Sequence, residues 1–173
     1  MIRPVLLGLL GPGMLLATVH GQTRMRFPTV KAYSLAKAKV TLPAELKGKE
    51  NLLVLSFDVS RGPEVDRWLR EAESLERLHA GLRYYVLPVS GRENDLYRWW
   101  QNSSMRGSYN DPQEWPWIVP LYVNRKQFRS ALQIAKDRTV VVLLTDQQGN
   151  VLWRTDGKLT QEKQAALNAA ISR

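Results

Sequence analysis

Apolar residues in the first half of the chain form one unbroken run and then a helical repeat. The run from Leu52 to Leu55 has no polar position, and such a strand is typical of a sheet that is covered on both faces. Pro63 suits the first turn of the helix that follows, Glu64 and Asp66 favour its positive end, and Gly81 is a natural stop. The apolar positions of this helix recur at spacings of three and four, at Val65, Trp68, Leu69, Ala72, Leu75 and Leu78.

Shorter elements are predicted on both sides of this helix. Two short strands precede it, at Thr29 to Tyr33 and at Lys39 to Leu42. Beyond it, "LRYYVLPVS" predicts another strand and "ENDLYRWWQNSSM" a helix, and "NRKQFRSALQI" is a short helix that Asn124 is placed to cap. Strands and helices therefore alternate, as expected of an α/β chain.

The last third of the sequence predicts a hairpin and a final helix. "TVVVLLTD" and "VLWRTDG" are the two strands, and Gly149 in the connecting "QQGN" stands where a positive φ is needed. Thr160 opens the final helix. The apolar side of that helix consists of Leu159, Ala166, Leu167, Ala170 and Ile171.

The N-terminal segment predicts export. Arg3 precedes an apolar stretch that glycine and proline interrupt, with a plausible cleavage site before Gln22. An uncleaved membrane anchor is the alternative, although the stretch is shorter than the ~20 unbroken apolar residues that a span needs. We expect a signal peptide at 1–21, an exposed leader at 22–28 and one domain at 29–173, with an insertion at about 92–121.

The residue inventory excludes several kinds of chemistry. The chain has no cysteine among its 173 residues, which removes disulfide exchange, thiol peroxidase chemistry and thiolate metal sites. His20 leaves with the predicted signal, so His79 is the only histidine of the mature chain, and a multi-histidine zinc site is excluded as well. We therefore expect neither a metal nor a cofactor.

The charge balance favours anionic partners. The formal net charge of +9 falls to +8 when the signal peptide takes Arg3 with it, and such a surface attracts anions over a Debye length of ~10 Å. Nucleic acid is not expected, because the basic residues are spread along the chain and the protein is predicted to be exported. We expect the protein to work near an anionic membrane or envelope surface.

The order of the segments and their sequences resemble those of the thioredoxin-like fold in periplasmic thiol reductases and peroxiredoxins. "FPTVKAYSL", "VTLPAELKGKENLLVLSF" and "VVVLLTDQQGNVLWRTDG" are similar to the opening segment, first central strand and closing hairpin of that superfamily. The resemblance implies an α/β three-layer sandwich, a central mixed sheet flanked by helices, with an aromatic-rich insertion. More narrowly, "LKGK", "FRSALQI" and "VLWRTDG" resemble the mitochondrial ATP-synthase assembly factor family.

The same resemblance locates a redox site that has lost its reactive groups. Counted from Phe57, the two sulfur positions of the reductase motif fall on or near Gly62 and Val65. The proline that faces the thiols in such enzymes falls at about Arg138. With both the thiols and the proline replaced, the resemblance implies that thiol chemistry at this site was abandoned.

Aromatic residues are concentrated in the predicted insertion, and they have two interpretations. They either form a second small core or line an exposed groove for a peptide or a lipid-facing partner, since Trp and Tyr dominate binding hot spots. On the second interpretation the candidate partner-binding residues are Trp99, Trp100, Tyr109, Trp115 and Trp117.

Carboxylates near the former thiol site offer an alternative based on catalysis. Asp58, Glu64 and Asp66 cluster there and Ser60 is close by, which leaves a hydrolase or another enzyme as an alternative. The simpler explanation is that the two helix-start acids stabilise the helix dipole and that Ser60 is a helix cap. Asp146 and Asp156 flank the hairpin, where turn formation accounts for them.

Together these observations predict an exported, redox-inactive, thioredoxin-like protein that works by binding. The family resemblance implies a protein client and assistance in assembling or maturing an envelope or membrane protein complex. A structural envelope protein is a further alternative. The sequence names neither the client nor the oligomeric state.

Overall fold

A computed structural model describes residues 25–57, 62–135, 137 and 139–171. The elements in chain order are β1 (Val30–Tyr33), β2 (Lys39–Leu42), β3 (Glu50–Ser56), α1 (Pro63–Leu78), β4 (Leu82–Ser90), α2 (Asp95–Ser108), a 3-10 turn (Trp115–Trp117), β5 (Leu121–Tyr122), α3 (Arg125–Ala131), β6 (Val141–Asp146), β7 (Val151–Asp156) and α4 (Gln161–Ile171). The strands and helices expected from the apolar pattern are therefore confirmed, with ends shifted by a few residues.

The main sheet has five strands in the order β5-β4-β3-β6-β7. β3 pairs parallel with β4 and antiparallel with β6, and β4 pairs parallel with β5. β7 closes one edge by pairing antiparallel with β6. The predicted mixed sheet is confirmed, including neighbouring β3 and β6 in its centre and the hairpin strand at its edge.

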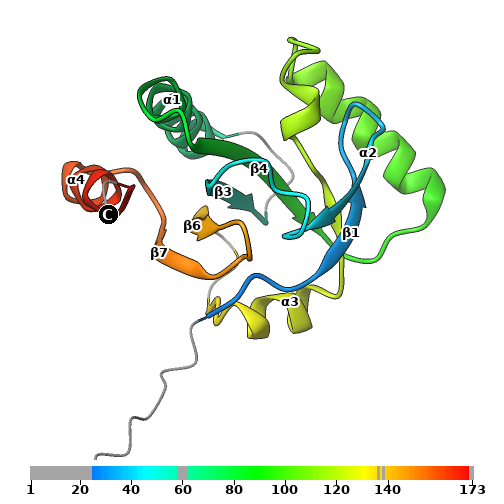
Figure 1. Ribbon diagram of the computed structural model, residues 1–173. Helices are drawn as coiled ribbons and strands as arrows, with labels where there is room; N and C mark the ends of the chain where they lie inside the picture. The colour runs from blue at the N-terminus through cyan, green and yellow to red at the C-terminus, as the bar shows by residue number, and fades with distance from the viewer. Residues whose placement is uncertain (1–24, 58–61, 136, 138, 172–173) are drawn as a thin grey trace, which may run out of the picture.

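Both faces of this sheet are covered, which explains the unbroken apolar run in β3. Leu52 and Val54 belong to one buried cluster with α1 and α4. Leu53 and Leu55 belong to a second cluster with α3 and the β1–β2 hairpin. Figure 1 shows the corresponding layers, with α1 and α4 on one side of the sheet and α3 with β1 on the other.

Helix α1 packs as its apolar repeat predicts. Trp68 is fully buried, and its indole Nε1 donates a 2.9 Å hydrogen bond to the carbonyl of Gly157. Its ring centroid lies 6.5 Å from that of Trp153 on β7. Leu78, the last apolar position of the repeat, is 74% exposed, because the helix ends there, short of the expected stop at Gly81.

Part of the predicted exposed leader is packed against the domain. Phe27 is 2% exposed and packs edge-to-face against Phe128 of α3, with ring centroids 5.7 Å apart. The Phe27 amide donates to the carbonyl of Gly149, and the Val151 amide donates to Met25. This stretch is therefore attached to the β6–β7 hairpin, and Met25 and Phe27 are part of the packed domain. The predicted signal peptide at 1–21 lies outside the described residues.

The β6–β7 turn forms as expected. Gly149 has φ 81°, and its amide donates to the carbonyl of Asp146 at 3.1 Å. The carboxylate of Asp146 accepts from both the backbone and the side-chain nitrogen of Asn150, at 2.8 and 2.7 Å. These bonds confirm that turn formation accounts for Asp146.

Strand β5 was not expected. Its two residues fall in a segment rich in proline and tryptophan that has no alternating pattern. The strand exists because the amides of Val119 and Val123 donate to carbonyls of Val86 and Ser90, at 2.8 and 3.1 Å. Part of the predicted insertion therefore forms the edge of the main sheet opposite β7.

Candidate functional site

The start of α1 is where a thioredoxin-like chain carries its thiols. Gly62 is the residue before the first turn and makes no side-chain cap, and Val65 is 4% exposed within the core beneath the helix. Neither residue carries a nucleophile or an acid. Glu64 and Asp66 lie in the first turn, as expected for acids at a positive helix end.

Three other residues assigned to this end of the molecule lie outside the described residues. They are Asp58 and Ser60, which precede α1, and Arg138, which precedes β6. Their assignment as a carboxylate, a helix cap and a replaced proline remains a sequence prediction.

The aromatic residues of the insertion divide into an exposed pair and a packed group. Trp99 and Trp100 in α2 are 65% and 58% exposed. Trp115 and Trp117 are half-buried, and each packs against one of the two core clusters. The interpretation as a second small core therefore holds for Trp115 and Trp117, whereas Trp99 and Trp100 are exposed, as the groove interpretation requires.

Tyr109 is a correction to the set of candidate partner-binding residues. It is 4% exposed and belongs to the core cluster under α1. Trp115 Nε1 donates a 3.0 Å hydrogen bond to its carbonyl. Tyr109 is therefore a core residue, because a partner cannot reach its ring without opening this packing.

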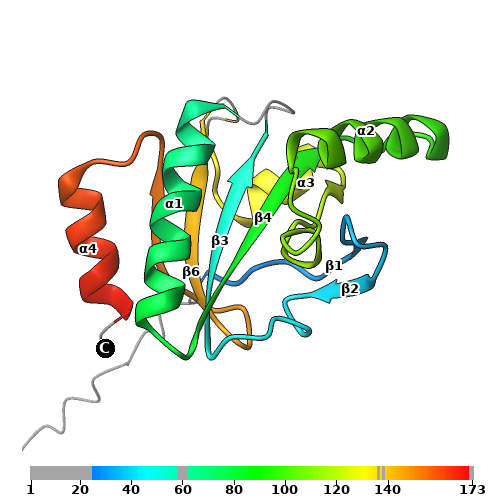
Figure 2. The same ribbon diagram turned by 90° about the horizontal axis from the view of Figure 1, so that it is seen from above.

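The side chains of α2 fall on three faces of the helix. Gln101 and Met105 are buried. Leu96 and Trp100, one turn apart, are exposed on an outer face where Tyr97 packs against Trp100 with ring centroids 5.7 Å apart. Figure 2 shows α2 extending beyond the edge of the sheet.

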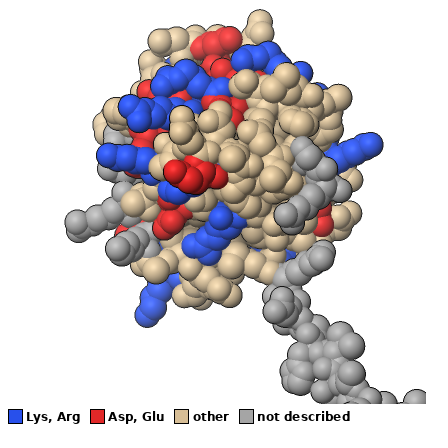
Figure 3. Space-filling view, turned by 90° about the vertical axis from the view of Figure 1, so that its left-hand side faces the viewer, with Lys and Arg blue, Asp and Glu red and all other residues tan. Residues whose placement is uncertain are grey.

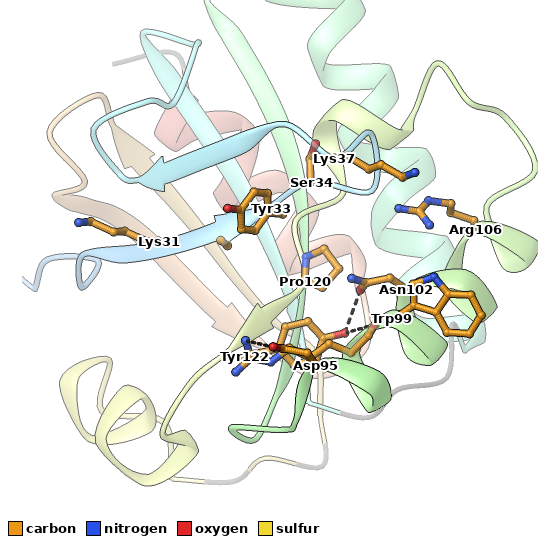
Figure 4. A pocket seen from close by; sticks show the side chains of 12 residues that line it. Lys31, Tyr33, Ser34, Lys37, Asp95, Trp99, Asn102, Arg106, Pro120 and Tyr122 are labelled. Atoms are coloured by element: carbon orange, nitrogen blue, oxygen red, sulfur yellow. Dashed lines mark hydrogen bonds and ion pairs between the residues drawn. The ribbon is translucent and has the colours of Figure 1, made fainter.

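The third face of α2 lines a cavity of about 420 Å³, here called the α2 groove. Its walls come from β1 and the turn after it, from α2, and from β5 with the residue before it. The lining residues are Lys31, Ala32, Tyr33, Ser34, Lys37, Asp95, Arg98, Trp99, Asn102, Arg106, Pro120 and Tyr122. In Figure 4 the side chains from β1 and those from α2 and β5 lie on opposite sides of the opening.

The α2 groove carries a surplus of positive charge. Four of its lining residues are cationic and one, Asp95, is acidic. Asp95 lies 3.7 Å from Arg98, but its side chain is fully exposed, so the pair neutralises little charge. Lys31 and Lys37 are exposed. The groove therefore favours an anionic ligand.

Two arginines of the groove are held by aromatic rings. The guanidinium carbon of Arg98 lies 5.2 Å from the ring centroid of Tyr122, and that of Arg106 lies 5.6 Å from the ring centroid of Trp115. Arg106 Nε also donates a 2.9 Å hydrogen bond to the carbonyl of Leu35. These contacts fix both cations before any ligand arrives, which lowers the entropic cost of binding.

Two polar atoms of lining residues lack a partner. Ser34 Oγ and Arg98 Nε are buried and make no hydrogen bond with any described residue. Ser34 as a whole is only 3% exposed. Such atoms are rare in folded proteins because leaving them unpaired costs free energy.

The sequence pattern drew attention to Trp99 but not to the other walls of the groove. Lys31 and Tyr33 occupy the exposed positions of β1, whose burial alternates along the strand. That alternation is visible in "VKAY", but nothing in the sequence places β1 beside α2. Arg98 and Tyr122 were missed for the same reason.

The described residues on the face that α1 and α4 cover carry charges of both signs. Figure 3 shows Lys and Arg interspersed with Asp and Glu on that side. Within the described residues, no group of His, Asp and Glu has a metal-binding arrangement. None of the helices described is both long enough and apolar enough to cross a bilayer.

No protein-family model and no curated protein matches this chain. Solved structures do. BsSco, a member of the Sco family of cytochrome c oxidase assembly proteins, is 13% identical with a TM-score of 0.60, covering 87% of this chain and 95% of that one. The thioredoxin domain of a thiol-disulfide oxidoreductase from Bacteroides vulgatus is 15% identical with a TM-score of 0.54, covering 86% and 96%.

A third structure is the exposed lipoprotein thioredoxin Etrx1 from Streptococcus pneumoniae. It is 10% identical with a TM-score of 0.54, covering 84% of this chain and 100% of that one. At such identities the similarity establishes the fold, and the chain is thioredoxin-like in its architecture. The narrower resemblance to the ATP-synthase assembly factor family remains a prediction.

Proposed function

We propose that this thioredoxin-like chain is a binding protein without thiol chemistry, which holds a protein client through α2. The observation that carries the proposal is the exposure of Trp99 and Trp100, 65% and 58%, on a helix that projects from the domain. Exposed neighbouring tryptophans are unfavourable in water and are the residue type most enriched in binding hot spots.

The absence of cysteine removes the usual activity of the fold. The whole chain contains none, and the nucleophile of a thioredoxin-like reductase is a thiolate at the start of a helix. Gly62 and Val65 supply no substitute at the start of α1. The fold is therefore retained as a scaffold for binding rather than for electron transfer.

The client is a protein of an envelope or membrane complex, which this chain helps to assemble or mature after export. The sequence supports export through its N-terminal segment. Among similar structures, BsSco belongs to a family described as cytochrome c oxidase assembly proteins, and Etrx1 is described as an exposed lipoprotein. Both descriptions are compatible with this role.

Affinity capture from detergent-solubilised membranes tests the proposal. The full chain should retain a defined client, identified by mass spectrometry and then shown to bind as a purified protein. Trp99→Ala and Trp100→Ala should each weaken binding of that purified client at least tenfold. Leu78→Ala is the control, since Leu78 is an even more exposed apolar residue and lies on α1 rather than on α2.

Two results would contradict the proposal. One is a client that binds the Trp99→Ala and Trp100→Ala variants as tightly as the unchanged chain. The other is reproducible hydrolysis or thiol turnover by the repurified protein, which would make it an enzyme.

A further inference from the structure

We propose that the α2 groove binds the phosphate headgroup of an anionic phospholipid, with Lys37 and Arg106 as the groups that hold the phosphate and Tyr33 and Trp99 at the lipid-facing rim. The inference goes beyond the proposed function, because it gives the chain a second ligand beside its client. It follows from the placement of the two cations, the size of the cavity and the position of the exposed aromatic rings.

Lys37 and Arg106 reach the same part of the groove from different elements. Lys37 belongs to the turn between β1 and β2, and Arg106 lies in the last turn of α2. Arg106 Nε donates to the carbonyl of Leu35, two residues before Lys37, so this end of α2 is attached to the turn. Figure 4 shows the ends of the two side chains extending toward each other. An anion in the space between them is attracted by both charges at once.

The polar ends of both side chains are available to a ligand. The contacts of Arg106 use its Nε and the face of its guanidinium, which lies over the Trp115 ring. Its two terminal nitrogens therefore remain as donors. Lys37 is exposed, and its ammonium group forms no ion pair with any described residue. A phosphate has oxygens on all sides, so it accepts from both groups together.

No acid of the groove lining neutralises this pair. Asp95 is the single acid among the lining residues, and it lies in the first turn of α2, whereas Arg106 lies in the last. At 1.5 Å per residue the two are about 16 Å apart along the helix. Asp95 instead lies 3.7 Å from Arg98, whose side chain is 38% exposed. The end of the groove at Lys37 and Arg106 therefore keeps its positive charge.

The cavity has room for more than an inorganic ion. Its volume of about 420 Å³ lies within the range of about 300–1,000 Å³ that is typical of sites for small organic molecules. Asn102 Oδ1 accepts from the Tyr122 hydroxyl, so the side-chain nitrogen of Asn102 remains a donor on the groove wall. Beside the phosphate, the cavity can therefore hold the glycerol part of a headgroup and hydrogen-bond its hydroxyls.

Exposed apolar residues gather around the opening. Seven large hydrophobic residues are exposed in the described chain, and five of them lie on α2 or, in the case of Tyr33, on β1. Tyr33 and Trp99 are 60% and 65% exposed and line the groove itself. Tyr and Trp are enriched at membrane–water interfaces, where their rings lie at the level of the headgroups. Aromatic rings beside cations match a phospholipid, whose acyl chains begin close to its phosphate.

A lipid in the groove leaves the outer face of α2 available to the client. Each residue of a helix advances by about 100°, which places Trp100 about 120° around the axis from Arg106. The two side chains therefore point in different directions from one helix. A chain that is bound to a lipid can still present Trp100 to a protein of the same membrane.

A short-chain lipid tests the site without a membrane. The probe is dihexanoylphosphatidylglycerol below its critical micelle concentration, followed by amide chemical shifts of the isotopically labelled full chain in NMR spectra. We expect saturable shifts at Lys37, Asn102 and Arg106, and an affinity that falls as salt rises. Dihexanoylphosphatidylcholine, in which choline neutralises the phosphate, should bind at least tenfold more weakly. Saturable shifts confined to other parts of the chain would overturn the inference.

Two soluble anions separate the lipid from other sources of negative charge. Inorganic phosphate and tetraglutamate should each bind at least tenfold more weakly than dihexanoylphosphatidylglycerol. Inorganic phosphate that binds within tenfold of the lipid would overturn the lipid assignment and make the groove a site for soluble phosphate. Tetraglutamate that binds within tenfold would overturn it in favour of protein carboxylates.

Charge variants locate the site. Lys37→Glu should weaken binding of the short-chain lipid at least tenfold. Lys126→Glu makes the same change at an exposed position of α3 outside the groove, and it should change binding less than threefold. Asp95→Asn should strengthen binding two- to fivefold, because it removes the acid of the lining. Circular dichroism verifies that the variants fold.

Equal losses in Lys37→Glu and Lys126→Glu would show that net charge, and not the groove, attracts the lipid. Co-sedimentation with vesicles of phosphatidylglycerol and phosphatidylcholine extends the comparison to a membrane. The Lys37→Glu variant should sediment less than the Lys126→Glu variant. Equal sedimentation of the two would overturn the groove as the membrane contact.

Failure of this inference can be told from failure of the proposed function. Trp100→Ala should lose the purified client but bind dihexanoylphosphatidylglycerol within threefold of the unchanged chain. Lys37→Glu should do the reverse in lipid-free buffer. If the client depends on Trp99 and Trp100 but the lipid does not bind, only this inference fails. If the lipid binds as expected but no client depends on α2, only the proposed function fails.

Discussion

The hydroxyl of Tyr122 donates a 2.8 Å hydrogen bond to Asn102 Oδ1, which joins the edge strand β5 to the middle of α2. The Tyr122 ring also lies beneath the guanidinium of Arg98. These two contacts, with that of Arg106 to Leu35, hold the projecting helix against the sheet edge. The position of both exposed tryptophans therefore depends on them.

The pH dependence of stability should report the Tyr122 contact. Burial raises the pKa of Tyr122 from 10.0 to about 12, with nearby Arg98 opposing the shift. The unfolded chain therefore loses this proton first, so the contribution is complete below about pH 10 and declines as pH rises towards 12. In Tyr122→Phe, the free energy of unfolding from urea titrations should fall less between pH 10 and 11.5. An unchanged slope would contradict the shift.

Two glycine substitutions should have opposite effects. Gly149 has φ 81°, and an added Cβ would collide with the ring of Pro43. Gly149→Ala should therefore destabilise the domain by at least about 1 kcal/mol. Gly107 lies in α2 with open space around its Cβ position, so Gly107→Ala should stabilise by about 0.5–1 kcal/mol. Denaturant unfolding of both variants checks the signs.

Tryptophans of the core and of α2 should differ sharply in their effect on stability. Trp68→Ala should cost about 3–5 kcal/mol because the side chain is fully buried and hydrogen-bonded. Trp100→Ala should change stability by less than about 1 kcal/mol, since its side chain is 58% exposed. If both variants lose their cooperative unfolding transition, Trp100 is part of the core.

Thiol assays should be negative. The purified chain has no cysteine, and we expect neither insulin reduction nor peroxide consumption above the buffer rate. Cysteines introduced together at Gly62 and Val65 should restore little activity while Arg138 remains. Substantial insulin reduction by that double variant would show that the replaced proline is not needed.

The sequence by itself determined the order of elements and the absence of cysteine. Runs such as Leu52 to Leu55 and the repeat in α1 are local patterns, and each reflects the faces that an element buries. Asn124 accepts from the amide of Gln127 as the sequence predicted, because a helix cap also needs only neighbouring residues. The absence of a residue type is read from the sequence without any structure.

Only the tertiary structure decided which aromatic residues are exposed and where a ligand fits. Trp99 and Tyr109 occur in one aromatic segment, yet one is 65% exposed and the other 4%. The difference arises because residues distant in sequence cover one side of the segment and leave the other open. The α2 groove likewise joins Lys31 to Arg98 and Tyr122, and these positions meet only because β5 completes the sheet edge next to β1.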